Sequence, residues 1–303
     1  MSIIEVDKLS KSYGSIQALD NISFRVEKGE VFGLVGPDGA GKSTFFNIAT
    51  TLGIPTSGRM SISGLDVIAD ALQIRRIIGY LPGTFSLYPD LSVEENLQFF
   101  AVMYKRKIEE NLDLIGPIWK QLSPFKGRRA GKLSGGMKQK LALCCALIHK
   151  PEILFLDEPT TGVDPVSRKE FWDILNDIKQ QGITVIVSTP YMDEATRCDR
   201  IALIQNGKII KIDTPRQIIQ DFKGKLFTMK ANNIFDLLHS MEKFGKRCIY
   251  YPYGEYFHIV FYDDEEQALS EFKDFLIQHG HEQNDITPIA PTIEDCFIEL
   301  VTA

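Results

Sequence analysis

Cysteine is scarce in this sequence and shows no pairing pattern. The 303 residues contain five cysteines, an odd number, and none of them forms a C-x-x-C pair. Such a set favours neither a disulfide framework nor a zinc site. The adjacent Cys144 and Cys145 lie in the apolar segment LALCCALI, where we expect them to be buried as small apolar side chains. The cysteines therefore argue against a disulfide-rich secreted domain and favour a cytosolic protein.

Long apolar runs and an excess of positive charge are also absent. LALCCALI is among the longest apolar segments, and it is far shorter than the roughly 20 residues that cross a bilayer. The N-terminal MSIIEVDKLSKSYG carries charges where a signal peptide would be apolar. Lysine and arginine together number 34, against 40 aspartates and glutamates, so the net charge is −6. This balance argues against nucleic acid as the main partner.

The remaining composition is that of an ordinary globular protein, with 44% hydrophobic and 24% charged residues. A length of 303 residues suggests two domains. In the first part, short apolar strands such as VFGLVG and PEILFLDEP alternate with helical patterns, and a helical block interrupts them at about residues 84–150. This alternation predicts an α/β fold, a parallel sheet that carries a helical insertion.

The pattern changes near Phe222, and residues 223–303 are predicted to form a small second domain. Beyond this point the order is strand, helix, two strands, helix and strand, which is the order of a split-βαβ, ferredoxin-like α+β fold. The helix TIEDCFIEL closes the chain, with Thr292 as its expected N-cap. We expect the many Phe and Tyr residues of this domain in its core rather than in a ligand platform.

A glycine-rich loop after a predicted buried strand fits the phosphate-binding pattern G-x-x-x-x-G-K-[ST]. Its glycines let backbone N–H groups approach phosphate oxygens, and the helix that follows adds partial positive charge. Lys42 supplies a charge for the β- and γ-phosphates of ATP, and the Ser43 hydroxyl can ligate Mg²⁺. Asp38 adds a negative charge to the loop and is expected to point away from the phosphates. The loop comprises Gly36, Pro37, Asp38, Gly39, Ala40, Gly41, Lys42, Ser43 and Thr44.

Two carboxylates, Asp157 and Glu158, follow the apolar segment ILFL. Asp157 is placed to hold Mg²⁺ through water, and Glu158 to orient or deprotonate the water that attacks ATP. An acidic pair after an apolar run is a weak signal by itself, because it also fits a solvated strand end. Combined with the upstream loop, it predicts ATP hydrolysis with Lys42 and Glu158 as the catalytic residues.

A third motif, LSGGMKQK, combines a helix-capping serine with two glycines that permit close backbone approach. Alone, it fits an ordinary helix start equally well. The three motifs in this order resemble the nucleotide-binding subunits of ABC transporters, from Ile3 to about Phe222. More loosely, APTIEDCFIEL resembles the C-terminal signature of drug-export and ABC-2-type ATPase subunits. GPDGAGK together with GRRAGKLSGGMKQKLAL is similar to the first half of a tandem ATPase of bacterial multidrug exporters.

The resemblance implies a P-loop NTPase fold at residues 1–222, with a RecA-like core, an antiparallel β edge and a helical subdomain. Residues 223–303 would be an accessory domain. The expected function is the ATP-binding subunit of an exporter, which couples closure of an ATPase dimer to a separate, membrane-spanning ABC-2-type permease. Residues 85–97, FSLYPDLSVEENL, match the surface that receives a coupling helix of the permease. The chain would then be cytoplasmic and peripheral at the inner face of the cell membrane.

The resemblance also implies roles for single residues. Tyr13 matches the aromatic side chain that stacks on adenine, although it also fits an ordinary edge-strand tyrosine. Ser134, Gly135 and Gly136 match the signature that contacts the γ-phosphate bound by the opposite subunit. Asp164 in TTGVDP matches the loop that crosses the same interface. ATP is then sandwiched between two such domains in a head-to-tail dimer.

Two positions depart from the family pattern. After IGYLP the family usually has a glutamine that senses Mg²⁺ and water, and here Gly83 offers no side chain. After VST it usually has a histidine that binds the γ-phosphate, and here it is Pro190, which carries no polar side chain. Because the other catalytic residues are present, we predict that nucleotide binding survives better than turnover.

These departures also bear on the second ATPase subunit. In a homodimer both ATP sites would be identical, and both would lack the two side chains. In a heterodimer a partner's site could retain them and be completed by this chain's signature. We favour the heterodimer, and a homodimer in which both variants are tolerated stays open.

Two other functions also stay open. A non-transport ABC ATPase would act on ribosomes or DNA, but such proteins usually carry both ATPase units in one chain, often with a charged linker. A regulatory or scaffold subunit would bind ATP without useful hydrolysis, and Gly83 and Pro190 are compatible with that role.

Overall fold

The computed structural model describes residues 2–230, 234–244, 248–262, 265–279, 281 and 286–302. The chain divides into two compact units, Met1–Pro215 and Arg216–Ala303. That the ATPase domain itself extends to residue 222 stays a prediction. Within the described ranges, no helix is long and apolar enough to cross a membrane.

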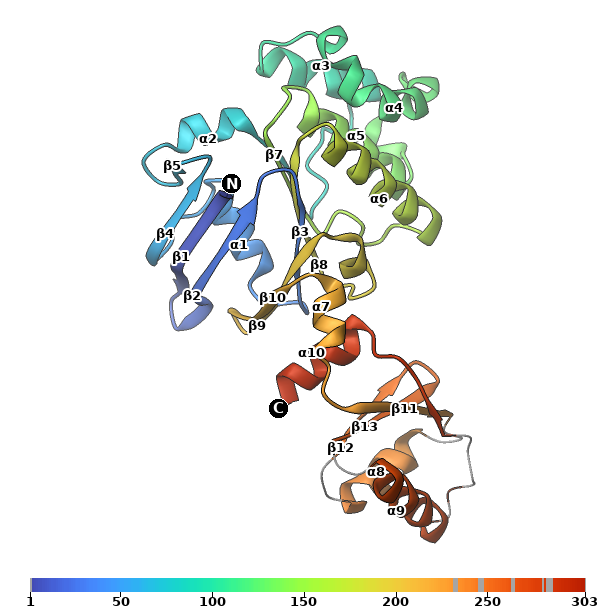
Figure 1. The fold of residues 1–303 in the computed structure, drawn as a ribbon. Helices are drawn as coiled ribbons and strands as arrows, with labels where there is room; N and C mark the ends of the chain where they lie inside the picture. The colour runs from blue at the N-terminus through green and yellow to red at the C-terminus, as the bar shows by residue number, and fades with distance from the viewer. Residues whose placement is uncertain are drawn as a thin grey trace. The chain divides into compact units, whose positions relative to one another are not determined.

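A six-stranded sheet forms the centre of the first unit (Figure 1). Its order is β10-β9-β3-β8-β7-β6, and every neighbouring pair is parallel except β10 and β9. Strands β3, β7 and β8 are buried over their whole length, as is typical of parallel strands covered on both faces. Ligands of such sheets meet the carboxyl ends of the strands. The strands are β3 Val31–Val35, β6 Ile78–Leu81, β7 Ile153–Asp157, β8 Thr184–Thr189, β9 Arg200–Gln205 and β10 Lys208–Asp213.

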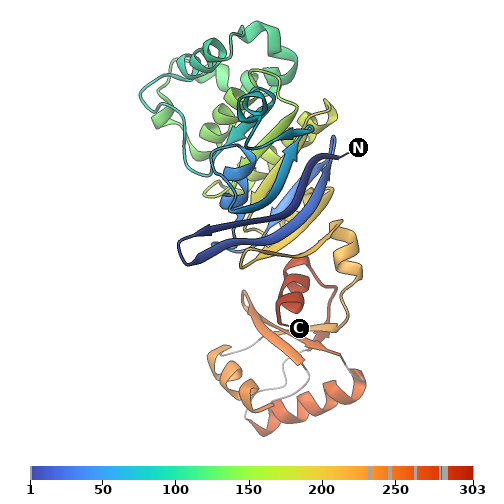
Figure 2. The same cartoon turned by 90° about the vertical axis from the view of Figure 1, so that its left-hand side faces the viewer.

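An antiparallel sheet with the order β2-β1-β4-β5 forms the second layer of this unit (Figure 2). Helix α1 packs between the two sheets. The ring of Phe45 lies 5.3 Å from that of Phe24 on β2, and the ring of Phe46 lies 5.8 Å from that of Phe155 on β7. This apolar core therefore holds the start of α1 beside the end of β3. The elements are β1 Ser2–Tyr13, β2 Ile16–Glu27, α1 Lys42–Ala49, β4 Ser57–Ile62 and β5 Leu65–Asp66.

The helical block predicted at about residues 84–150 is present, and its first helix begins with a capping box. The Ser92 hydroxyl accepts from the backbone N–H of Glu95, whose carboxylate accepts from the N–H of Ser92, so two otherwise unpaired donors at the start of α3 are satisfied. The buried Lys140 on α5 donates to Gln121 on α4 and to Glu170 on α6, at 2.7 and 2.6 Å. The helices of this block are α3 Val93–Met103, α4 Leu112–Leu122 and α5 Gly135–Leu147. Helices α2 Ala71–Ile77 and α6 Pro165–Gln180 lie elsewhere in the first unit, and α7 Pro215–Gln220 begins at the boundary of the two units.

The second unit confirms the predicted ferredoxin-like order. Its sheet runs β12-β13-β11-β14 with all neighbours antiparallel. Buried side chains of α8 and α9, including Leu237 and Phe272, pack with one face of this sheet. Ile298 of α10 packs on the opposite face with Leu226 and Val260. The elements are β11 Lys225–Lys230, α8 Ile234–Phe244, β12 Cys248–Tyr253, β13 Tyr256–Phe261, α9 Glu265–Gln278, β14 Thr287–Pro288 and α10 Ile293–Thr302.

A buried carboxylate joins α10 to the sheet of the second unit. Asp295 is fully buried, and its Oδ1 lies 2.6 Å from the hydroxyl of Tyr251 and 2.7 Å from Nδ1 of His258. Its Oδ2 accepts from the backbone N–H and the hydroxyl of Thr292, at 2.7 and 2.6 Å. Burial raises the pKa of Asp295, but the hydrogen bonds from His258, Thr292 and Tyr251 outweigh it and lower the pKa to about 2. The ionised carboxylate is therefore part of the native packing.

Asp295→Asn is expected to lower the free energy of unfolding of the second unit by about 3 kcal/mol, because it removes one partner of a buried charged network. The folded pKa lies below the unfolded one, so the contribution of Asp295 is fully present above the unfolded pKa and is lost as the pH falls toward about 2. Hydrogen exchange of α10 and β13, measured at neutral and acidic pH, tests both effects. The exposed Asp274 on α9 provides the control, Asp274→Asn, and equal exchange in both variants would contradict the assignment.

Candidate functional site

The predicted phosphate loop connects β3 to α1 at the carboxyl edge of the central sheet. Gly41 has φ of 107°, and a Cβ at this position would lie 2.4 Å from the carbonyl oxygen of Ala18, so only glycine fits. Among the described residues, no side chain caps the start of α1. Its first backbone N–H groups are therefore suited to bind an anion. Of the loop's side chains, Ser43 is exposed and Thr44 is partly exposed.

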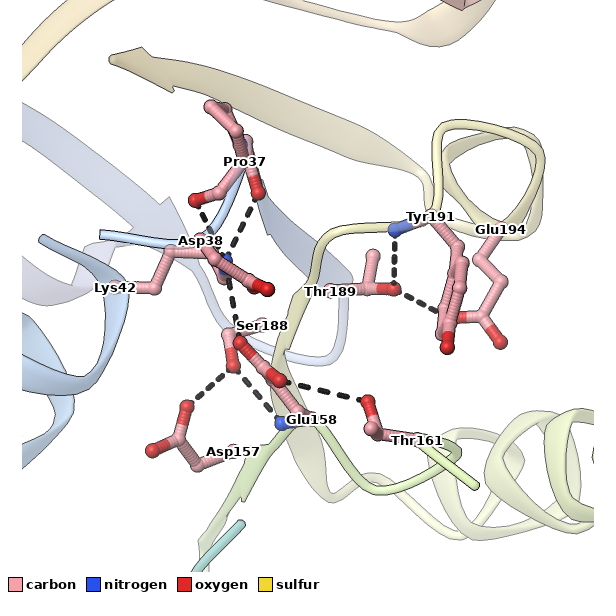
Figure 3. A network of polar contacts seen from close by, with 11 residues as sticks. Pro37, Asp38, Lys42, Asp157, Glu158, Thr161, Ser188, Thr189, Tyr191 and Glu194 are labelled. Carbon is pink, nitrogen blue, oxygen red and sulfur yellow. Dashed lines mark hydrogen bonds and ion pairs between the residues drawn. The ribbon is translucent and has the colours of Figure 1, made fainter. Parts of the chain in front are cut away.

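Lys42 lies at the centre of the site and is 3% exposed. Its Nζ donates to the carbonyl oxygens of Gly36 and Pro37, at 2.9 and 3.0 Å, and lies 3.2 Å from Oε1 of Glu158 (Figure 3). Oδ1 of Asp38 lies 3.9 Å from the same Nζ. The expectation that Asp38 points away from the phosphate position is therefore wrong, because its carboxylate turns back toward the ammonium group meant for the phosphates.

Asp157 is the last residue of β7 and Glu158 follows it directly, and Ser188 of the neighbouring strand β8 organises both. The parallel register places Ser188 opposite Asp157. The Ser188 hydroxyl donates to Oδ1 of Asp157 at 2.5 Å and accepts from the backbone N–H of Glu158 at 2.9 Å (Figure 3). Burial, and then the charge of Asp157, raise the pKa of Tyr80 to about 12. Asp157 is thus a buried, oriented carboxylate, while Glu158 reaches toward Lys42.

Gly83 lies beside this acidic pair. A Cβ at Gly83 would lie 3.2 Å from the carbonyl oxygen of Asp157 and 3.9 Å from its Oδ2. A longer polar side chain at this position would therefore reach the carboxylate of Asp157. Glycine offers none.

Pro190 follows the end of β8, and side chains on both sides of it hold the segment in place. The Thr189 hydroxyl accepts from the backbone N–H of Tyr191 at 3.1 Å and donates to Oε2 of Glu194 at 2.6 Å (Figure 3). Oε1 of Glu194 accepts from Thr160, two residues after Glu158, at 2.7 Å. Glu194 therefore connects the end of β8 to the loop that follows Asp157 and Glu158. Pro190 contributes no hydrogen-bond donor to this connection.

Ser188 and Glu194 were not among the predicted site residues. Ser188 carries a usable signal, because it is a polar residue at the end of the apolar strand ITVIV and parallel strands end together. Glu194 offers no such signal. It is 3% exposed, and its contacts to Thr160 and Arg168 form only once the turn after β8 has folded back onto these segments.

The proposed trans-acting residues form a second cluster, at the starts of α5 and α6. The Ser134 hydroxyl caps α5 by accepting from the backbone N–H of Met137. A Cβ on Gly136 would lie 2.8 Å from the hydroxyl oxygen of Ser167 on α6, so only glycine allows this close contact. Asp164 caps α6, and the hydrogen bonds from Ser167 lower the pKa of its carboxyl. Ser134, Gly135 and Asp164 are exposed.

Tyr13, the predicted adenine contact, lies at the end of β1 and is half exposed. Nζ of Lys11 lies 4.9 Å from the centre of its ring. A half-exposed ring with a neighbouring cation suits either stacking on a base or an ordinary edge position.

The structure therefore brings Asp38, Lys42, Gly83, Asp157 and Glu158 together at one edge of the sheet. This arrangement can hold a polyphosphate on backbone N–H groups and a buried ammonium, with a carboxylate beside it that can accept a proton from water.

Comparison with known proteins supports this assignment. The family model described as "ABC transporter" matches residues 19–161. The chain is 43% identical over 221 residues to the probable multidrug ABC transporter ATP-binding protein YbhF of Escherichia coli, covering 71% of this chain and 37% of that protein's length. It is 31% identical to the daunorubicin resistance ATP-binding protein DrrA3 of Streptomyces coeruleorubidus, covering 98% and 95% of the two chains. The solved dimeric, post-hydrolysis structure of the ATP-binding cassette MJ0796 with ADP and Pi is 28% identical, with a TM-score of 0.63 over 70% of this chain and 98% of that chain.

Proposed function

The chain belongs to the ABC transporter family as one of its ATP-binding ATPases, and from this premise we propose that it powers an exporter by coupling ATP-driven dimer closure to a separate membrane-spanning permease. The names of YbhF and DrrA3 refer to multidrug transport and drug resistance, which favours export and an ABC-2-type permease. We place the chain at the cytoplasmic face of the membrane, held there by the permease.

The observation that carries the ATPase role is the approach of Glu158 to Lys42. Lys42 Nζ is buried and lies 3.2 Å from Oε1 of Glu158. When phosphate groups occupy Lys42, Glu158 is released from this ion pair and becomes the proton acceptor for the attacking water. Its backbone N–H stays fixed by Ser188, so the side chain can turn while its base remains in place.

Mg²⁺ is the metal that we propose for the site. The Ser43 hydroxyl and the Asp157 carboxylate are the hard oxygen donors that this ion prefers, and Asp157 is already oriented by Ser188. The bound ion would neutralise charge on the phosphates of ATP.

We propose that this site turns over slowly. At Gly83 no side chain reaches Asp157, and at Pro190 no donor faces the phosphates. Loss of one donor to the transition state commonly costs on the order of 10² in rate. Binding depends on Lys42 and the loop, which are intact, so the site is suited to hold ATP for long periods.

For the second ATPase subunit, we propose a heterodimer. The solved relative MJ0796 forms a dimer, and the exposed cluster of Ser134, Gly135 and Asp164 is available to a partner. In a heterodimer this cluster completes a partner's site that retains the two missing side chains. A homodimer with two slow sites is the alternative.

A cavity of about 300 Å³ beside the helical block is the proposed docking site for the permease. It borders the predicted docking segment, residues 85–97, and exposed aromatic side chains, Phe85, Tyr88 and Phe99, lie nearby in sequence. Exposed apolar groups around a cavity are typical of an interaction site. The cavity is lined by Thr50, Leu52, Arg75, Ile78, Tyr80, Ser86, Leu87, Phe100, Tyr104, Ala142, Cys145 and Ala146.

Leu52→Glu is expected to reduce co-purification of the permease at least about tenfold, because a charge would be buried against its docking helix. Leu52 is 64% exposed, so the fold and ATP binding of the free chain should be unaffected. Ile68→Glu, at an exposed position outside the cavity lining, provides the control. The experiment compares the proteins recovered with each tagged variant from native membranes, and steady-state ATPase with and without them.

These measurements also separate the alternatives. A ribosomal or DNA complex in place of a membrane protein would support a non-transport ATPase. A membrane partner without any turnover, even in the complex, would support a regulatory subunit. Equal recovery of the permease with Leu52→Glu would reject the docking site.

A further inference from the structure

The phosphate loop contains a carboxylate that competes for its own lysine. Asp38 is 89% exposed at its side chain, yet its Oδ1 lies 3.9 Å from Nζ of Lys42. Glu158 lies 3.2 Å from the same Nζ, and it comes from a different segment, directly after the end of β7. The ammonium group, 3% exposed, therefore faces two carboxylates where the phosphates of ATP are expected.

The two carboxylates differ in what they can do. Glu158 is partly buried, and its backbone N–H is fixed by Ser188, so it belongs to the catalytic machinery. Asp38 lies on the loop itself, and its carboxylate is paired with Lys42. A phosphate chain that binds Lys42 would therefore lie beside the negative charge of Asp38.

The loss of nucleotide affinity caused by the Asp38 carboxylate depends on the charge of the ligand. A divalent cation cancels part of the negative charge of a triphosphate. Repulsion from Asp38 is then larger for the metal-free nucleotide than for its metal complex. At an exposed position in physiological salt, for phosphate charges about 5 Å away, the repulsion weakens binding about 15-fold for metal-free ATP and about 4-fold for the magnesium complex.

We propose that Asp38 is a specificity-determining residue that makes this site select metal-complexed nucleotide over metal-free nucleotide. The inference rests on the proposed function, because it requires that Lys42 binds the phosphates of ATP. Asp38 then keeps a slow site from being occupied by ATP that lacks the metal needed for hydrolysis.

Calorimetry on the full chain tests the inference, with ATP plus Mg²⁺ or ATP plus a chelator as ligand. Asp38→Asn keeps the size of the side chain and removes its charge. We expect this substitution to increase the affinity for metal-free ATP about 15-fold and the affinity for the magnesium complex about 4-fold. The preference for the magnesium complex then falls about 4-fold. The difference should shrink at high salt. Asp38→Glu keeps the charge and should keep most of the selectivity, and the exposed Asp7 on β1 provides the control, Asp7→Asn.

Equal tightening of the two ligands by Asp38→Asn, or no change in either, would overturn the inference while leaving the proposed function in place. Selectivity lost in Asp38→Glu as fully as in Asp38→Asn would also overturn it, because shape rather than charge would be responsible. Failure of the wild-type chain to bind either form of ATP would overturn the proposed function itself.

Discussion

Lys42→Ala is expected to weaken binding of the magnesium complex of ATP at least about 100-fold, because charge-assisted bonds to phosphate oxygens are among the strongest polar contacts in proteins. Lys42 is the buried cation of the phosphate loop, and its Nζ lies between the loop carbonyls and Glu158. Removing it also leaves the charge of Glu158 without its ion-pair partner beside the incoming phosphates, which adds repulsion. Calorimetry measures the change in affinity.

The fold should survive this substitution, since α1 is held by Phe45 and Phe46 between the two sheets. Thermal unfolding checks that point. Lys208→Ala is the matched control, because Lys208 forms an exposed ion pair with Asp20 on the edge of the same unit, and such pairs contribute little. Unchanged affinity in a folded Lys42→Ala variant would show that the loop is not the nucleotide site.

Local patterns predicted most of the fold and the phosphate loop. The loop after β3 and the acidic pair at the end of β7 are short segments that can be recognised from consecutive residues. The order of strands and helices after residue 222 was enough to predict the ferredoxin-like sheet. The family resemblance predicted the antiparallel edge and the helical subdomain.

Contacts between distant segments could not be predicted in this way. The bond from Ser188 to Asp157 joins residues 31 positions apart and depends on the register of two strands, and Glu194 reaches Thr160 through a turn with no sequence signature. The direction of Asp38 was predicted wrongly because an exposed side chain is oriented by the opposite charge nearest to it, and the loop brings it back to Lys42.

The joint substitution Gly83→Gln with Pro190→His is expected to raise ATP turnover of the isolated chain by about 10- to 100-fold, since each restores a polar group near the reacting phosphate. A Cβ added at Gly83 would meet the carbonyl oxygen of Asp157 at 3.2 Å, so the backbone must shift by a few tenths of an ångström. The imidazole introduced at position 190 would stand on a strand tip already fixed by Thr189 and Glu194. Steady-state phosphate release measures turnover, and adding Glu158→Gln should return it to background.

The same joint variant distinguishes the two dimers. In a heterodimer the partner's site already performs most of the turnover, so the complex should gain little while the isolated chain gains much. In a homodimer both sites are identical, so ATP turnover should rise by the same factor in the complex and in the isolated chain. The slow site itself would be contradicted if the wild-type chain alone matched the complex in turnover and fell to background in Glu158→Gln. Gly83 and Pro190 would then be tolerated variants, and Glu158 with Lys42 would suffice for hydrolysis.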